Sequence, residues 1–163
     1  MTASVNVIRR RSASPPVHLL DVEIGPGGRT RVRGALWDGM LNASPEDTTD
    51  GPSPIEALLA GVAGCFVRNL RWVADGAHVD FARIGVHLSA DREDDPPAIS
   101  RVHMDVELET AAAAPRVAGI VHRALRTGTI TRTVARAVDL SMTLRINGSA
   151  WAVDLAAVGL ARE

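Results

Sequence analysis

Two segments of alternating apolar and polar residues constrain the fold of this chain more than any other feature. From Phe81 to Ala90, and again from Ile99 to Glu109, apolar side chains fall on every second position. Such alternation is typical of a strand that buries one face. A charged stretch from Asp91 to Pro97 separates the two segments. The pattern predicts an antiparallel hairpin whose apolar face other elements must cover.

Weaker patterns predict the remaining elements. A polar loop is expected at 42–50, and a second helix from Pro115 to about Arg126, continuing to Arg136 after a break at Gly128. The segment from Ser149 to Leu160 reads as either helix or strand. Further strands are expected at Ser4–Arg10, Val17–Ile24, Thr30–Trp37 and Val138–Ile146. The order predicts one α+β domain with a mainly antiparallel sheet and two principal helices.

The clearest helix signal begins at Ser53. Ser53 can cap the helix, Pro54 suits the first helical position, and Glu56 stands three residues after the cap. This is a capping box. The helix is expected to run to about Ala74, before Gly76.

Composition excludes several classes of function. The 163 residues carry a net charge of −1, which gives no general attraction for nucleic acid or an anionic membrane. No apolar stretch is expected to approach the roughly 20 residues needed to span a bilayer, and no secretory signal is recognised. The single cysteine excludes an intramolecular disulfide, so we expect a cytoplasmic location.

That cysteine, Cys65, lies about three turns into the helix that Ser53 opens. On a helical wheel, Leu58, Gly61, Asn69 and Trp72 share its side, and Arg68 flanks it at about 60°. Two interpretations stay open for Cys65. It is either a small buried apolar residue, or a reactive thiol that a nearby arginine activates, because the chain has no lysine.

Metal binding is the weaker interpretation of the histidines. His87 and His103 fall on the polar face of the predicted hairpin, roughly opposite each other. Two histidines alone do not complete a metal site, which needs three or four ligands. We therefore expect a solvated sheet face, with no metal and no cofactor.

The pattern G-P-S-P-I-E-A-L-L-A-G-V-A-G-C, from Gly51 to Cys65, is the most specific motif of the chain. It resembles the segment before the first cysteine of the OsmC/Ohr family of thiol-dependent hydroperoxide reductases. The stretch from Asp91 to Leu108 resembles its charged turn and following strand. T-G-T-I-T-R-T-V, from Thr127 to Val134, resembles its second cysteine segment. The likeness covers about Val17 to Ile146 of a single domain spanning 1–163, which leaves 147–163 as a C-terminal extension.

The resemblance implies an intertwined homodimer that reduces organic hydroperoxides at the subunit interface. It assigns the attacking thiol to Cys65 and the thiolate-pairing cation to Arg29, with Arg31 and Arg33 as open alternatives. Leu58, Gly61, Arg68, Asn69 and Trp72 are then the expected substrate contacts. The implied partners are a second copy of the chain, a small-molecule hydroperoxide and an external thiol reductant.

The chain departs from the family pattern at two of its functional positions. The second cysteine is replaced by Gly128, and the glutamate ten residues before the attacking cysteine is replaced by Ile55. A sulfenic acid on Cys65 would therefore need an external thiol to resolve it. Two hypotheses follow: a one-cysteine peroxidase, or a non-catalytic relative that binds an apolar small molecule at the dimer interface.

Overall fold

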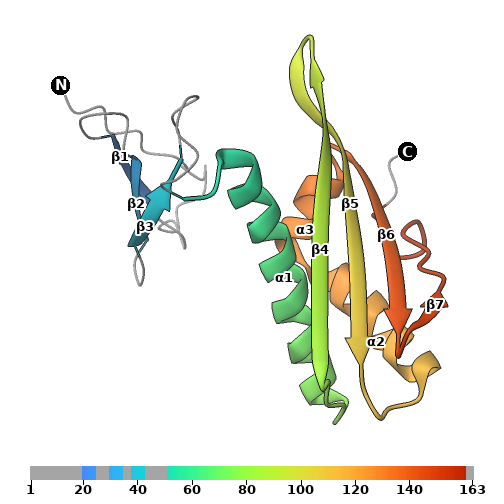
Figure 1. Cartoon of the computed structure of the whole chain (residues 1–163). Coiled ribbons are helices and arrows are strands. Elements are labelled where there is room, and N and C mark those ends of the chain that lie inside the picture. The colour runs from blue at the N-terminus through green and yellow to red at the C-terminus, as the bar shows by residue number, and fades with distance from the viewer. Residues whose placement is uncertain (1–19, 25–29, 35–37, 43–50, 161–163) are drawn as a thin grey trace, which may run out of the picture. The chain divides into compact units, whose positions relative to one another are not determined.

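The computed structural model describes residues 20–24, 30–34, 38–42 and 51–160 (Figure 1). The first predicted strand, Ser4–Arg10, and most of the predicted loop at 42–50 lie outside these residues. The chain divides into two compact units, Met1–Leu58 and Leu59–Glu163. Each unit is described by itself.

The N-terminal unit contains a three-stranded antiparallel sheet. Its strands, in order, are β1 (Leu20–Ile24), β2 (Thr30–Gly34) and β3 (Asp38–Leu41). Val22 pairs with Val32, which is buried. On the exposed side, Arg31 forms an ion pair with Asp38 that lowers the pKa of the Asp38 carboxyl. β3 was not predicted from the sequence.

The C-terminal unit contains a four-stranded sheet in the order β4-β5-β6-β7. The alternating segments form β4 (Arg83–Asp94) and β5 (Pro97–Glu109), which pair antiparallel as predicted. β6 (Asp139–Ile146) runs parallel to β5, and the short β7 (Ser149–Trp151) returns antiparallel to β6. The sheet is mainly antiparallel, with one parallel pair that the sequence did not reveal.

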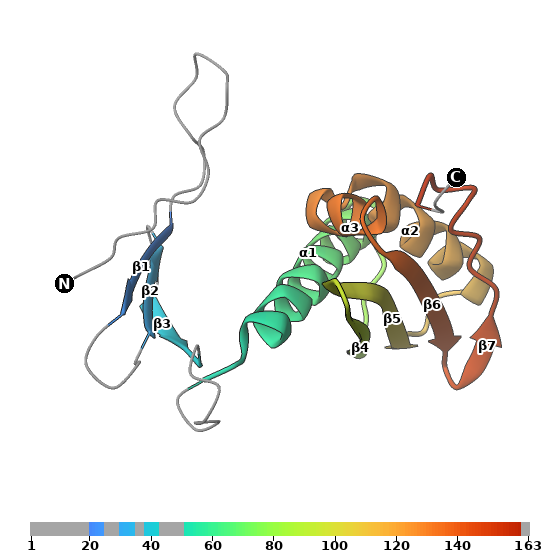
Figure 2. The ribbon, with the colours of Figure 1, turned by 90° about the horizontal axis from the view of Figure 1, so that it is seen from above.

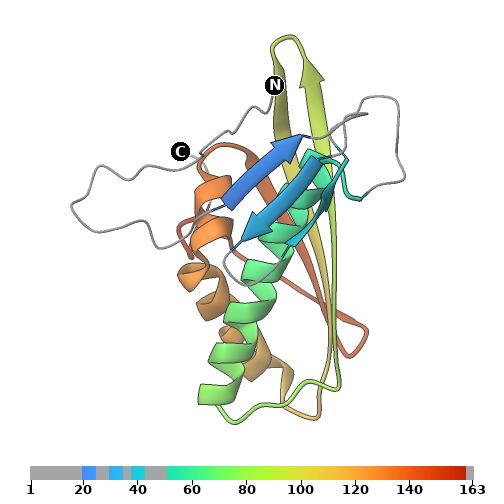
Figure 3. The ribbon, with the colours of Figure 1, turned by 90° about the vertical axis from the view of Figure 1, so that its left-hand side faces the viewer.

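Three helices cover one face of this sheet (Figure 2). They are α1 (Pro54–Gly76), α2 (Ala114–Thr127) and α3 (Thr129–Ala135), and α2 and α3 follow one another beside α1 (Figure 3). The inward side chains of β5 are fully buried beneath them: Val102, Met104, Val106 and Leu108. The two principal helices predicted from sequence are thus three, because the chain breaks at Gly128.

α1 places five residues in the core, at helical spacing: Val62, Phe66, Leu70, Val73 and Ala74. The rest of the helix is largely apolar as well, so by length and composition α1 could cross a membrane. The expectation that no stretch reaches that length was wrong. A core helix passes the same test, and α1 packs its buried stripe into the same core as β5.

The capping box at the start of α1 is confirmed. The Ser53 amide donates to the Glu56 carboxylate over 2.7 Å, and the Glu56 amide donates to the Ser53 hydroxyl over 3.3 Å. The first of these bonds lowers the pKa of Glu56, since it favours the ionised carboxylate. Glu56 therefore stabilises the folded chain above its ordinary pKa of about 4.3 and loses that contribution as pH falls through its lowered folded value.

Glu56→Gln is expected to lower stability at pH 7, and to lower it by less at pH 3. The variant and the wild type should therefore converge in acid, because protonated Glu56 is a poor acceptor for the Ser53 amide. Urea unfolding at both pH values measures the difference. Ser53→Ala, which removes the hydroxyl, should cost about 1 kcal/mol at either pH. A gap between Glu56→Gln and wild type that stays constant with pH would contradict this account.

Candidate functional site

Cys65 lies half-buried on α1, at the edge of the stripe that enters the core. Its neighbour Phe66 points into the core and is only 1% exposed, which fixes the rotation of the helix at this turn. At Gly61 and Gly64, which precede Cys65, no neighbouring atom of the described structure lies within 4 Å of where a Cβ would stand. Glycines in a helix can allow another element to approach closely, or they can leave space beside the backbone. The described residues show open space at both positions.

Two groups donate hydrogen bonds to the Cys65 sulfur. The backbone amide of Ile130 lies 3.4 Å from Sγ, and the side-chain Nδ2 of Asn69 lies 3.6 Å from it. Ile130 belongs to the first turn of α3, where amides have no partner within the helix and are free to bond elsewhere. The Cys65 sulfur is therefore held by one donor from its own helix and one from α3.

Asn69 is tied to its surroundings at both ends of its amide. Nδ2 also donates to the Cys65 carbonyl over 2.7 Å, one helical turn back. The Thr127 hydroxyl, at the end of α2, lies 3.2 Å from Oδ1. The sulfur therefore lies where α1 meets the end of α2 and the start of α3.

Gly128, at the position of the family's second cysteine, is the single residue between α2 and α3. Its backbone is extended, with φ −71° and ψ 102°. A Cβ built on it would lie 3.2 Å from Oγ1 and 3.3 Å from Cβ of Thr131. Thr131 is fully buried, and its hydroxyl has no partner within the described structure. The Thr131 side chain thus fills the space next to the missing side chain.

The other residues predicted for the site do not all lie beside the Cys65 sulfur. Leu58, Gly61 and Arg68 are exposed on α1, while Arg29 lies outside the described residues. Trp72 is 68% exposed and lines a hollow of about 350 Å³, together with Val73, Asp75, Gly76 and Arg123. Among the predicted residues that the structure describes, only Asn69 donates a hydrogen bond to the sulfur of Cys65.

Ile130 and Thr127 were not among the predicted site residues. Ile130 contributes its backbone amide, which every residue except proline has, so its residue type could not predict this role. The resemblance of Thr127–Val134 to the second cysteine segment was the available signal, because it implied that these residues lie near Cys65.

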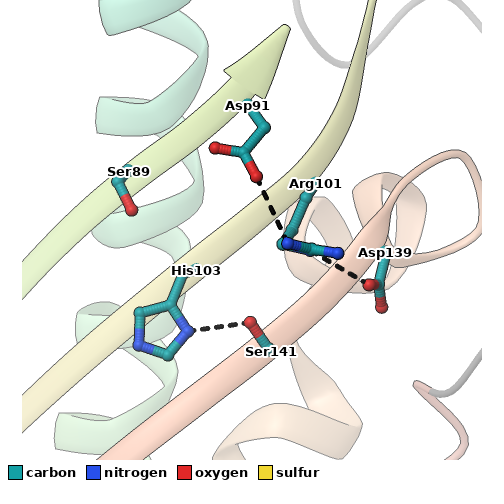
Figure 4. Close-up of a pocket in the computed structure, with 6 residues that line it drawn as sticks. All are labelled: Ser89, Asp91, Arg101, His103, Asp139 and Ser141. Atoms are coloured by element: carbon teal, nitrogen blue, oxygen red, sulfur yellow. Dashed lines mark hydrogen bonds and ion pairs between the residues drawn. The ribbon is translucent and has the colours of Figure 1, made fainter.

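A larger hollow, of about 570 Å³, lies on the face of the C-terminal sheet opposite the helices (Figure 4). Its lining is polar: Ser89, Asp91, Arg101, His103, Asp139 and Ser141. Arg101 bridges Asp91 and Asp139 at 3.4 and 3.3 Å, and His103 Nδ1 lies 2.8 Å from the Ser141 hydroxyl. These are neighbours on adjacent strands, so the hollow is a network of cross-strand pairs on a solvated face.

The sheet register also separates the two histidines that were expected to face each other. His87 pairs with Asp105 and His103 pairs with Ser89, which leaves the histidines two residues out of register. Within the described ranges, no group of three or more histidine, cysteine or acidic residues could hold a metal ion.

Solved structures with this fold are numerous and distant in sequence. An OsmC-like protein from Mycoplasma pneumoniae superposes with a TM-score of 0.74 at 12% identity, covering 82% of this chain and 99% of that one. An organic hydroperoxide resistance protein OsmC from Legionella pneumophila gives 0.63 at 15% identity, covering 80% and 98%. The organic hydroperoxide resistance protein OhrB of Bacillus subtilis gives 0.57 at 16%, covering 79% and 98%. These likenesses show the fold.

No curated protein sequence matches the chain. The model of one protein family does, and its description is OsmC-like protein. The match runs over residues 46–143, from before the capping box through Cys65, Asn69 and the start of α3 into β6. Because it covers more than half of the sequence, including Cys65 and the two described donors to its sulfur, this chain belongs to the OsmC-like protein family.

Proposed function

We propose that this protein reduces organic hydroperoxides through Cys65, with an external thiol in place of a second cysteine. Family membership supports the class of reaction, as do structural relatives named for organic hydroperoxide resistance. The observation that carries the proposal is the Cys65 sulfur, which is half-buried and accepts a hydrogen bond from the Ile130 amide at 3.4 Å. A cysteine that only filled the core would have no need of such donors.

The reaction begins with the Cys65 thiolate. Its sulfur attacks the terminal oxygen of the hydroperoxide, the O–O bond breaks, and the alkoxide leaves as the alcohol after taking a proton. Cys65 is left as a sulfenic acid. An external thiol then attacks the sulfur and releases water, giving a mixed disulfide. A second thiol attacks this disulfide and returns Cys65 to the thiol.

The proposal includes a homodimer in the cytoplasm. Three large apolar side chains are exposed on α1, namely Ile55, Leu58 and Trp72. In a homodimer the partner would cover such apolar surface. The need for a free thiol as reductant fits a reducing compartment, which in most cells is the cytoplasm.

Treatment of the reduced protein with one equivalent of cumene hydroperoxide is expected to add one oxygen atom to Cys65. Dimedone should trap this sulfenic acid, and dithiothreitol should reverse it. Since Cys65 is the only cysteine, the intact mass of the dimedone adduct assigns the thiol chemistry without ambiguity. The chain also has four methionines, whose oxidation dimedone does not report.

Cys65→Ser is the matched control, because it replaces the sulfur with an oxygen of similar position. It should form no dimedone adduct and consume no peroxide in the presence of thiol, and it should unfold at the same urea concentration as the wild type. Peroxide consumption that Cys65→Ser leaves unchanged, or a wild type that forms no adduct, would remove the proposal.

A further inference from the structure

We propose that Asn69 protects the oxidised sulfur of Cys65 from a second hydroperoxide, and that Thr127 positions Asn69 for this task. The inference rests on the proposed function. Because the chain has no second cysteine, a sulfenic acid on Cys65 persists until an external thiol reacts with it. During that time another hydroperoxide can oxidise it to a sulfinic acid, which thiols do not reduce.

The orientation of the Asn69 amide follows from its surroundings. The Cys65 carbonyl oxygen, an obligatory acceptor, lies 2.7 Å from Nδ2. An oxygen at that position would face another oxygen without a proton between them, so the atom there must be the NH₂ nitrogen. This nitrogen carries two protons. One bonds the carbonyl, and the other is available to the sulfur at 3.6 Å.

The opposite end of the amide meets Thr127. Its hydroxyl has one proton and three acceptors within reach: Asn69 Oδ1 at 3.2 Å, the Arg123 carbonyl at 3.1 Å and the Ala124 carbonyl at 3.2 Å. The bond to Asn69 is therefore one of three that the hydroxyl can form. Asn69 contacts the reacting sulfur. Thr127, at the end of α2, acts only through its hydrogen bond to Asn69 on α1.

The chemistry of over-oxidation explains what these donors accomplish. Formation of the sulfinic acid requires the sulfenate sulfur to attack a second hydroperoxide, forming a second S–O bond while the O–O bond breaks and an alcohol leaves. Hydrogen bonds from Asn69 Nδ2 and the Ile130 amide draw on the sulfur's electron density. They oppose this second oxidation by making the sulfenate less nucleophilic.

The test compares how far each protein passes from the sulfenic to the sulfinic state at the same excess of cumene hydroperoxide. Intact mass separates the gain of one oxygen atom from the gain of two, and peptide mapping assigns both to Cys65. In Asn69→Ala the ratio of sulfinic to sulfenic acid should rise about fivefold, the change that one net hydrogen bond of typical strength makes. Asn69→Asp, which keeps the shape but has no donor when ionised, should raise it at least as much.

Thr127 provides a second, independent pair of variants. Thr127→Val removes the hydroxyl at almost constant shape and should raise the ratio by a smaller factor than Asn69→Ala. Thr127→Ser keeps the donor and should restore the wild-type ratio. A purely structural role for Thr127 would change the unfolding midpoint without changing the ratio, so both are measured.

The outcomes separate this inference from the proposed function. A wild-type protein that never gains one oxygen overturns the proposed function. A wild type that does so, with an unchanged ratio in Asn69→Ala and Asn69→Asp, overturns the protective role of Asn69. If either Asn69 variant does not fold, the Thr127→Val and Thr127→Ser pair decides, since both keep Asn69, and equal ratios in that pair overturn the coupling.

Discussion

Phe66→Ala is expected to lower the free energy of unfolding by about 3–5 kcal/mol. Phe66 is 1% exposed and packs with the buried side chains of β5 and α2 in one core cluster. Removal of the ring loses its transfer free energy and leaves a cavity that the surrounding strands and helices can fill only in part. Urea unfolding followed by circular dichroism measures the loss.

Phe66→Leu is the matched control, because it stays apolar and keeps much of the volume. It should cost less than about 1.5 kcal/mol. Phe66 also sets the rotation of α1 next to Cys65, so Phe66→Ala should slow the reaction of Cys65 with peroxide even where the protein stays folded. A Phe66→Ala variant as stable as Phe66→Leu would mean that the α1 stripe does not enter the core as described.

The residue pattern predicted most elements of the C-terminal unit because burial there is periodic. α1 and the β4–β5 pair were anticipated within a few residues, from the capping box and from the alternation. The end of β4 was not anticipated. β4 runs on to Asp94, through charged residues that read as a turn, because an exposed hairpin tip can pair by backbone bonds alone.

Features that depend on distant residues escaped prediction. Parallel pairing of β6 with β5 follows from the crossover through α2 and α3, and no local pattern distinguishes it from antiparallel pairing. The segment after Gly148 forms a three-residue strand and then turns, which resolves the choice between helix and strand only in its first residues. β3 has four residues and includes a glycine, too few for alternation to be visible.

In the candidate site, too, some residues could be predicted from the local sequence and others could not. Cys65 and Asn69 could be found because they are side chains one helical turn apart on a recognisable segment. Thr127 and Ile130 reach them from 58 and 65 residues away along the chain. Their contribution consists of one hydroxyl and one backbone amide, so only the packing of three helices around the sulfur reveals it.

Gly128→Cys, combined with Thr131→Ala, is expected to convert the one-cysteine site into a disulfide-forming site. The family resemblance places a second cysteine at this position, and the Ile130 amide on the sulfur shows that the start of α3 lies against Cys65. The backbone of Gly128 poses no obstacle, since its φ of −71° suits any residue. The obstacle is Thr131, whose hydroxyl lies 3.2 Å from the added Cβ.

Removal of that hydroxyl should cost little, because it is buried without a partner in the described structure. Gly128→Cys alone is expected to lose about 1–3 kcal/mol through overpacking. The added Thr131→Ala should recover part of this loss, because it removes the hydroxyl but keeps the Thr131 Cβ, 3.3 Å from the added Cβ. After one equivalent of peroxide, the double variant should lose two hydrogen atoms and form no dimedone adduct. Reduction by dithiothreitol should reverse the change.

Gly128→Ser with Thr131→Ala is the matched control, since it has nearly the same shape without a second sulfur and should still be trapped by dimedone. The variant with Gly128→Cys and Thr131→Ala should also resist oxidation to the sulfinic acid when Asn69 is replaced by alanine. The new thiol should react with the sulfenic acid before a second peroxide reaches it. A dimedone adduct that persists in the double cysteine variant would show that residue 128 does not reach Cys65. The loss of the family's second cysteine would then have been accompanied by a rearrangement of α3.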